Sequence, residues 1–294
     1  MQHTGVMLCS LFVTNRDKLF NVYFLTIGIS EESEKKLTEM CQSYGANFHV
    51  NNCTIDSIGD LPIGQWNAIM YLKLFIPEVL PVNIERCLFL DVDMVINADI
   101  DLLYSIDLED KVLAAAEDVP DCIGYKSRLG LSFDNCYINS GVMVCELRRW
   151  RKMEQKYPIF DFTRSVVDII QNEQDVIAMY FKNNIKLLPI KWNMTTFYFR
   201  RSPMIFDKYR PQLREAKLNP AIIHFACPIK PWFRDCNHPL GYLYLYYLCL
   251  TPWANAGRKL PIYEKLTPRQ RFNKHIKNIL NRIGILRYDG FLIR

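Results

Sequence analysis

The sequence has no apolar run long enough to span a membrane. Its longest run, Gly241–Leu250, is soon followed by Pro252 and falls well short of the roughly 20 residues that a spanning helix needs. The start shows no basic segment leading into an apolar one, and neither an internal repeat nor a low-complexity tract occurs. We therefore expect a chain that does not cross a membrane and carries no secretory signal.

Paired cysteines are also missing. None of the ten cysteines forms a Cys-X-X-Cys pair, and most lie inside apolar runs, as Cys87, Cys145 and Cys249 do. Reduced, buried thiols in a cytosolic protein show this pattern, so we expect no disulfide framework.

Hydrophobic residues, by contrast, are plentiful. The chain has 294 residues, 50% of them hydrophobic and 13% aromatic, which is enough to bury the core of one large domain.

Positive charge is concentrated at the C-terminal end. The net charge is +5, but residues 258–294 carry ten Lys or Arg against only Glu264 and Asp289, which leaves the rest of the chain mildly acidic. A short stretch of Pro, Ala, Asn and Gly at residues 252–257 precedes this tail. We therefore expect a globular domain over residues 1–253 and a basic extension over residues 254–294.

The basic extension contains an amphipathic pattern. Thr267 and Pro268 suit the N-cap and first position of a helix, and the basic residues lie largely away from the apolar ones. The apolar residues that recur at helical spacing are Phe272, Ile276, Ile279, Leu280 and Ile283. This pattern predicts either a helix that lies on an anionic membrane surface or an ordinary helix packed against the body.

Short apolar stretches alternate with helical patterns in the body. The stretches rich in branched residues are Asn21–Ile27, Cys87–Leu90, Lys111–Glu117, Tyr137–Leu147 and Ala221–Ala226. The helical patterns are Glu31–Tyr44, Gln65–Phe75, Leu147–Lys156 and Gln174–Lys182. Continuous apolarity is typical of strands buried on both faces, so we expect a largely parallel sheet in an α/β doubly wound fold.

The first fifteen residues favour a buried helix, although a fold of this class should open on a strand. The apolar residues Val6, Met7, Leu8, Leu11 and Phe12 suit a helix packed under a sheet. We therefore expect that the first strand of the fold is lacking, either because the natural start lies upstream or because the chain is a truncated remnant.

Two carboxylates stand at the end of the strand that begins at Cys87. Asp91 and Asp93 are two residues apart, so in an extended segment they point the same way. They repel each other unless a cation joins them, and strand ends are where α/β sheets bind ligands. A divalent metal site is one interpretation. The other is a polar strand end that faces water, with Asp91 capping the next turn.

A second apolar strand also ends in polar residues. His224 lies within the apolar stretch Ala221–Ala226, and Lys230 follows it between two prolines. Carboxylates with one imidazole suit Mn²⁺, and a fixed Lys suits a phosphate. A histidine hydrogen-bonded in the core is the alternative interpretation of His224. If the acidic pair and these two residues meet, they form a metal-diphosphate site.

Four stretches, in this order and spacing, resemble the family 8 glycosyltransferases, particularly the bacterial lipopolysaccharide and lipooligosaccharide α-galactosyl- and α-glucosyltransferases. They are "LFLDVDMVINADIDLL", "YINSGVMVCELRRWR", "NEQDVIAMYF" and "IIHFACPIKPW". The resemblance implies a GT-A fold, a Rossmann-like sheet flanked by helices. It also implies a UDP-galactose or UDP-glucose donor, Mn²⁺ (or Mg²⁺), and transfer with retention of anomeric configuration.

The resemblance also implies roles for single residues. Asp91 and Asp93 match the metal-binding DxD motif, with Asp91 also close to the donor, and His224 matches the third metal ligand. Lys230 matches the lysine that contacts the donor diphosphate. Asn139 matches the asparagine that contacts the donor sugar.

Further matches concern the reacting centre. Gln174 matches the glutamine near the anomeric carbon, and Asp118 matches an acidic residue near both sugars. Glu173 stands where the family usually has Asp; a first-turn helix carboxylate is the alternative interpretation. Lys73, also near donor groups, stands where most members have Arg. Cys227 replaces a Gly that lets the backbone approach a phosphate, so its side chain could crowd the diphosphate.

The resemblance implies a retaining hexosyltransferase that acts on a lipopolysaccharide or lipooligosaccharide core glycan, which we expect to be reached at the inner face of the plasma membrane. Its partners would be a UDP-hexose, the glycan acceptor and, through the tail, an anionic membrane surface. An inactive, N-terminally truncated remnant or a sugar-nucleotide-binding pseudoenzyme is the alternative. A nucleic-acid binder is disfavoured because the positive charge is confined to one segment without interleaved aromatic residues.

Overall fold

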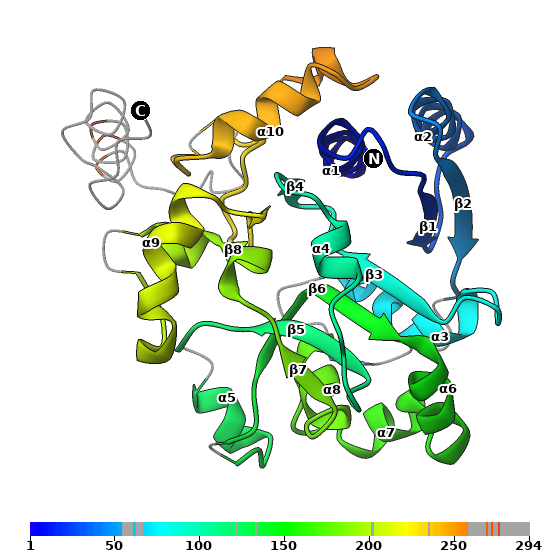
Figure 1. Cartoon of the computed structure of the whole chain (residues 1–294), viewed down its shortest axis with the longest axis vertical. Coiled ribbons are helices and arrows are strands. Elements are labelled where there is room, and N and C mark those ends of the chain that lie inside the picture. The colour runs from blue at the N-terminus through cyan, green and yellow to red at the C-terminus, as the bar shows by residue number, and fades with distance from the viewer. Residues whose placement is uncertain are drawn as a thin grey trace.

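The computed structural model shows strands and helices alternating along the chain (Figure 1). It describes residues 1–54, 61–62, 67–120, 123–132, 134–200, 203–234 and 236–257, and the single residues 269, 272 and 276. The strands are β1 (Asn21–Thr26), β2 (Asn47–Asn52), β3 (Arg86–Leu90), β4 (Met94–Ile96), β5 (Leu113–Glu117), β6 (Ile138–Glu146), β7 (Ile185–Leu187), β8 (Met194–Thr195) and β9 (Ile222–His224). The α-helices are α1 (Gln2–Thr14), α2 (Glu31–Ser43), α3 (Ile76–Val79), α4 (Asp101–Tyr104), α5 (Ile123–Arg128), α6 (Leu147–Lys156), α7 (Ile159–Ser165), α8 (Glu173–Tyr180), α9 (Arg210–Leu218) and α10 (Gly241–Leu248).

The described strands form three sheets. β6 is the longest strand and lies inside a four-stranded sheet of order β3-β6-β5-β7, in which β3 and β5 run antiparallel to β6 and β7 runs parallel to β5. A three-stranded sheet has the order β4-β9-β8, and β1 and β2 form a separate parallel pair. The pairing is therefore mixed rather than largely parallel as expected. A continuous run of apolar residues indicates that both faces of a strand are buried. It does not indicate whether the neighbouring strand is parallel or antiparallel.

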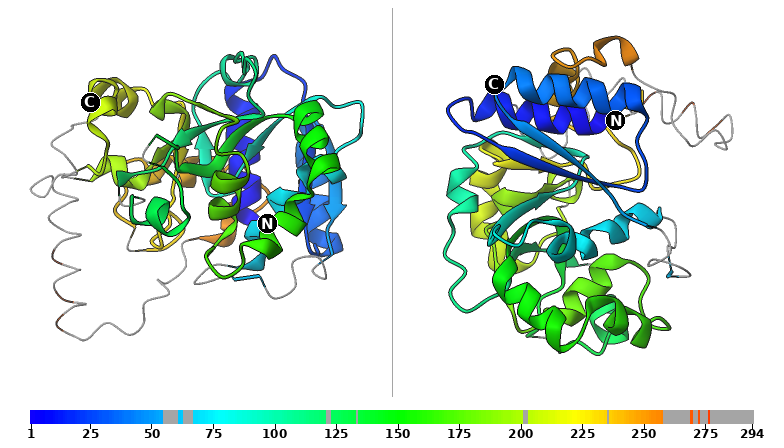
Figure 2. Two further views of the ribbon diagram at one scale, coloured as in Figure 1. Left: turned by 90° about the horizontal axis from the view of Figure 1, so that it is seen from below. Right: turned by 90° about the vertical axis from the view of Figure 1, so that its right-hand side faces the viewer.

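Helix α1 is the buried helix that the first residues predict. Ten of its thirteen residues are buried, and it packs against β4 and α10. Ser10 fixes it to the sheet because its hydroxyl accepts a hydrogen bond from the backbone N–H of Ile96 at 2.9 Å. Figure 2 shows α1 and α2 side by side. In the described part of the chain no strand precedes α1 and none joins β1 to β3.

Two hydrophobic clusters hold the sheets and helices together. One gathers residues of α1, β4, β9 and α10, and the other lies around β5, β6, α6 and α8. β6 contributes to both: Val142 and Val144 belong to the first cluster, and Met143 and Cys145 to the second, as alternation along a strand dictates. The second half of β6 is thus held from both faces, which makes the strand a rigid support for the side chains around it.

The predicted tail helix lies outside the described residues except for Arg269, Phe272 and Ile276, which are helical. The proposed division into residues 1–253 and 254–294 accordingly stays a prediction. Among the described helices, none has the length and apolarity needed to traverse a bilayer.

Candidate active site

The acidic pair occupies the short connection between β3 and β4. Asp91 continues the β3–β6 ladder, because its backbone N–H donates to the carbonyl of Gly141 at 2.9 Å. Asp93 continues the β4–β9 ladder, because its carbonyl accepts from the N–H of Phe225 at 3.0 Å. In the antiparallel β4–β9 register Met94 is opposite His224, so His224 is brought next to Asp93. Backbone pairing thus joins segments that are more than a hundred residues apart.

Asp91, Asp93 and His224 form one cluster. One potential ligand atom from each residue lies within 4.8 Å of the other two. His224 Nε2 is 3.2 Å from Asp93 Oδ1, and Lys230 Nζ is 2.5 Å from Asp93 Oδ2 and 2.8 Å from the carbonyl of Phe225. The structure therefore brings together the three predicted metal ligands and the lysine predicted for the diphosphate.

A chain of amides fixes the orientation of the His224 ring. Asn193 Nδ2 donates to Asn139 Oδ1 at 2.8 Å, which leaves Asn193 Oδ1 as an acceptor 2.9 Å from His224 Nδ1. With Asn193 Oδ1 as the acceptor for Nδ1, Nε2 is the ring nitrogen that faces Asp93 and the cluster, and it is the nitrogen that would ligate a metal ion. Asn193 was missed by the sequence analysis, since its role depends on the parallel β8–β9 pairing.

Gly141 leaves the space that the cluster needs. A Cβ placed on Gly141 would lie 2.5 Å from His224 Cε1, 2.9 Å from Asp91 Oδ2 and 2.9 Å from Met94 Cε. Real Cβ atoms do not approach other atoms so closely. The backbone of β6 thus lies against Asp91 and the imidazole, and only a residue without a side chain fits there.

The two carboxylates differ in their electrostatic surroundings. Burial raises the pKa of Asp91; Lys73 opposes this rise, whereas the nearby carboxylates of Asp93 and Glu173 add to it. Burial would also raise the pKa of Asp93, but His224 and Lys230 outweigh it and hold that pKa well below the usual range. The charge of Asp91 is therefore the less well compensated, and a cation beside both carboxylates would relieve their repulsion.

The donor set fits a divalent metal ion. Two carboxylates and an imidazole suit Mn²⁺ or Mg²⁺ better than the thiolate-rich sets that select softer metals. The imidazole directs Nε2 toward the cluster, and Gly141 keeps the space beside Asp91 Oδ2 clear. Asp91, Asp93 and His224 would hold the ion.

The remaining predicted residues meet at the start of β6 and of α8. Asn172 caps α8 by accepting from the N–H of Asp175, which places Glu173 and Gln174 in the first turn. Gln174 Oε1 accepts from the N–H of Ser140 at 3.1 Å, and Gln174 Nε2 donates to Asp118 Oδ2 at 2.8 Å. The predicted reacting centre is thus assembled around β6.

Asp118 and Cys227 complete the predicted set. Burial raises the pKa of Asp118, and hydrogen bonds from Val119, Gln174 and Asn139 oppose that rise. Cys227 lies partly exposed in the loop between His224 and Lys230, where its thiol is 3.7 Å from the carbonyl of Ile229. Its side chain therefore points back to its own loop.

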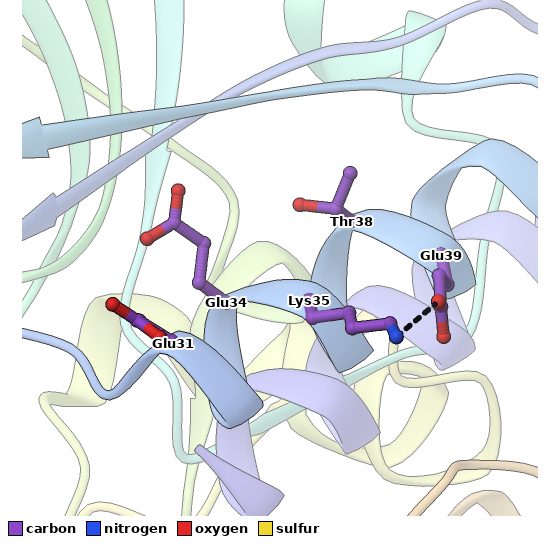
Figure 3. Close-up of a pocket in the computed structure, with 5 residues that line it drawn as sticks. All are labelled: Glu31, Glu34, Lys35, Thr38 and Glu39. Atoms are coloured by element: carbon purple, nitrogen blue, oxygen red, sulfur yellow. Dashed lines mark ion pairs between the residues drawn. The ribbon is translucent and has the colours of Figure 1, made fainter.

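A separate hollow of about 510 Å³ lies on α2, away from the cluster (Figure 3). It is open to solvent and lined only by residues of this helix: Glu31, Glu34, Lys35, Thr38 and Glu39. Lys35 and Glu39 form an ion pair one turn apart at 3.8 Å. None of the predicted site residues lines this hollow, and its solvated charges are those of an ordinary exposed helix face.

Comparisons with known proteins agree with this arrangement. The sequence model of Glycosyl transferase family 8 matches residues 1–236. General stress protein A of Bacillus subtilis is 27% identical over 87% of this chain and 92% of its own length. A lipopolysaccharide 1,2-glucosyltransferase of Escherichia coli K12 is 25% identical over 85% of this chain and 75% of its own length.

Solved structures show the same fold. The galactosyltransferase LgtC, in complex with donor and acceptor sugar analogues, superimposes with a TM-score of 0.73 at 21% identity, over 93% of this chain and 95% of LgtC. An active-site mutant of LgtC gives a TM-score of 0.76, also at 21% identity, over 85% of this chain and 92% of the mutant. The predicted α/β fold of the GT-A type is thereby confirmed.

Proposed function

Because the chain belongs to glycosyl transferase family 8, we propose that it is a retaining hexosyltransferase that moves galactose or glucose from a UDP-sugar onto a lipopolysaccharide or lipooligosaccharide core glycan. The observation that carries this proposal is the cluster of Asp91, Asp93 and His224 beside Lys230. Carboxylates, an imidazole nitrogen and an ammonium in one place suit a metal-bound diphosphate.

The leaving group explains why these side chains are needed. Cleavage of the sugar–phosphate bond leaves negative charge on the departing UDP. Bound Mn²⁺, or Mg²⁺, would supply Lewis-acid neutralisation of that charge. Lys230 adds a fixed ammonium, whose side chain is 23% exposed and so can serve both Asp93 and a diphosphate. Asn193 keeps the His224 ring oriented with Nε2 toward the cluster.

The surroundings of Glu173 and Gln174 favour front-face attack. Retention requires either a covalent glycosyl-enzyme or attack by the acceptor on the face from which UDP leaves. Gln174 has an amide, which is a poor nucleophile. Glu173 is only 10% exposed, and its Oε1 contacts Lys73 at 2.8 Å and Ser140 Oγ at 3.0 Å. Since neither is a free nucleophile, we assign Gln174 and Asp118 to positioning the reacting sugars.

The acceptor class is supported by the relatives. The names of the E. coli relative and of other similar proteins specify lipopolysaccharide as the molecule on which they act. An acceptor of this kind is anchored in lipid, so we place the enzyme peripherally at the inner face of the plasma membrane, with the basic tail against anionic headgroups. Deletion of Leu266–Arg294 should reduce pelleting with phosphatidylglycerol vesicles; equal pelleting of both proteins would argue against this placement.

A catalytically silent sugar-nucleotide-binding protein is the second candidate. The specific observation in its favour is Cys227, which brings a side chain into the loop between His224 and Lys230. Against it stand the complete set of candidate metal ligands and the oriented imidazole.

Release of UDP from a panel of UDP-hexoses separates the two candidates. The wild-type chain should slowly hydrolyse UDP-galactose or UDP-glucose in Mn²⁺, and EDTA or the Asp93→Asn substitution should abolish this release. A wild-type protein that binds UDP but hydrolyses no UDP-hexose in Mn²⁺ would instead be the silent binding protein. The sugar that supports release identifies the donor.

A further inference from the structure

Lys73 is buried between two carboxylates. Only 4% of its side chain is exposed, and its Nζ lies 2.8 Å from Glu173 Oε1 and 3.3 Å from Asp91 Oδ1. Ser140 supplies two further acceptors, its Oγ at 3.1 Å and its carbonyl at 3.5 Å. An ammonium has three protons, so protein atoms are sufficient to engage all of them. A lysine in this position is held by the protein around it.

The electrostatics agree with a permanently charged Lys73. Burial alone would lower the pKa of this amine, but the carboxylates of Asp91 and Glu173 outweigh it and raise the pKa. Glu173 lies closer to the ammonium than Asp91 does, and it also accepts from Ser140 Oγ at 3.0 Å. Glu173 is therefore the nearer partner of Lys73, and Asp91 is a second counter-ion at a longer distance.

Lys73 and Glu173 are a hundred residues apart in the sequence, and the structure joins them in one contact. Arg is longer than Lys by one heavy atom along the side chain, and Asp is shorter than Glu by one methylene. Replacing Lys73 by Arg and Glu173 by Asp together would therefore keep their combined reach.

We propose that Lys73 and Glu173 are a matched positioning pair for the metal ligand Asp91. Glu173 holds the ammonium of Lys73 in place, and Lys73 in turn holds Oδ1 of Asp91. The carboxylate is thereby turned so that Oδ2 faces Gly141 and His224, where the ion binds. This inference rests on the proposed function, because it takes the cluster to be a metal site.

The other carboxylate is held in the same way. Lys230 contacts Oδ2 of Asp93, and Oδ1 of Asp93 then faces His224 Nε2 at 3.2 Å. Each acidic residue thus has one oxygen taken by a lysine and one oxygen directed to the common centre. The two lysines differ in the other groups that they contact. Lys73 is shared with Glu173, which keeps it from competing fully with a cation for Asp91.

Shortening one partner should disturb this arrangement without changing any charge. In Glu173→Asp the carboxylate retreats from Lys73 by about one carbon–carbon bond, so Lys73 moves onto Asp91 and competes with the ion. Mn²⁺ binding, measured without any sugar nucleotide by electron paramagnetic resonance, should weaken roughly 10-fold, as is typical when a partner of a metal ligand is altered. Lys73→Arg alone should also weaken binding, because a guanidinium does not fit beside the longer Glu173.

The double substitution Lys73→Arg with Glu173→Asp is the decisive variant. It restores the combined reach, so its Mn²⁺ affinity should return to within about threefold of wild type, a coupling that independent residues would not show. Glu154→Asp is the matched control. It shortens another partly buried carboxylate, which accepts from Trp150 Nε1 and the N–H of Ile159, and should leave Mn²⁺ binding unchanged.

The outcomes separate this inference from the proposed function. The pairing would be overturned if Glu173→Asp bound Mn²⁺ as tightly as wild type. It would also be overturned if the double variant lost as much Mn²⁺ affinity as the two single variants together. Either result would leave the metal site itself supported. A wild-type protein that binds no Mn²⁺ would overturn the metal site and the pairing with it. Melting temperatures without metal distinguish misfolding from mispositioning, since only mispositioning weakens binding in a protein that melts like wild type.

Discussion

Replacing Gly141 by alanine should damage the candidate metal site more than the fold. The added Cβ would lie 2.5 Å from His224 Cε1, about 1 Å inside ordinary van der Waals contact. It would also lie 2.9 Å from both Asp91 Oδ2 and Met94 Cε. Only Met94 has a flexible end that can give way. His224 is held by Asn193, and Asp91 by Lys73, so the clash must displace metal ligands.

These distances allow the expected losses of stability and of Mn²⁺ affinity to be estimated. Overpacking a buried site by one methyl group typically destabilises a protein by about 1–3 kcal/mol, which lowers the melting temperature of a chain of this size by a few degrees. Displacement of His224 or Asp91 should in addition weaken Mn²⁺ binding by at least ~10-fold. Titration of Mn²⁺ by calorimetry, together with thermal unfolding in EDTA, measures the two effects separately.

Gly124 provides the matched control. It lies in α5, and a Cβ built on it meets no heavy atom within 4 Å. Gly124→Ala should therefore leave Mn²⁺ binding unchanged and leave stability unchanged or slightly increased, because alanine is the better helix former. A Gly141→Ala protein that is folded and binds Mn²⁺ as tightly as wild type would refute the steric reasoning.

Three further substitutions test other parts of the site. Lys230→Met should reduce kcat/KM for the UDP-sugar by about 10²–10³-fold because it removes a positive charge beside the leaving group; an unchanged kcat/KM would show that Lys230 has no such role. Asn193→Ala should weaken Mn²⁺ binding by about 10–100-fold, since the His224 ring loses its acceptor; an unaltered dissociation constant would exclude this orienting role. Burial raises the pKa of Asp118, so its ionised form is disfavoured in the folded state. Asp118→Asn should therefore raise the melting temperature at pH 7, and the gain should vanish below about pH 4, where the carboxyl is protonated in both states. A gain that persists at low pH would assign the effect to another cause.

Most residues of the candidate site could be named from the sequence, because the polar side chains follow recognisable apolar strands. Asp91 and Asp93 follow an apolar strand, His224 lies in a second apolar stretch and Lys230 follows it, so the two polar strand ends could be located from the apolar pattern. The roles of single residues came from the family resemblance. Periodicity predicted some of the helices closely. The predicted Leu147–Lys156 has the bounds of α6, and Glu31–Tyr44 differs from α2 by one residue. The predicted Gln65–Phe75, by contrast, forms a 3₁₀ helix over Ala68–Phe75 in its described part, and α7 and α9 were not predicted.

What the sequence could not show depends on pairing between distant segments. Apolar runs do not reveal strand direction, so the mixed pairing around β6 was not foreseen. Asn193 becomes an orienting residue only because β8 lies beside β9, and Gly141 only because β6 lies against β3. Likewise, Lys73 and Glu173 could be noticed singly, but their contact is a property of the fold.

Anomalous X-ray scattering from crystals grown with Mn²⁺ and UDP tests the proposed metal site most directly. We predict one strong manganese peak bonded to Asp91, Asp93 and His224 and to the diphosphate, with Lys230 within hydrogen-bond distance of a phosphate oxygen. A peak at another position, or ordered UDP in the cluster without any manganese at saturating Mn²⁺, would contradict the assignment.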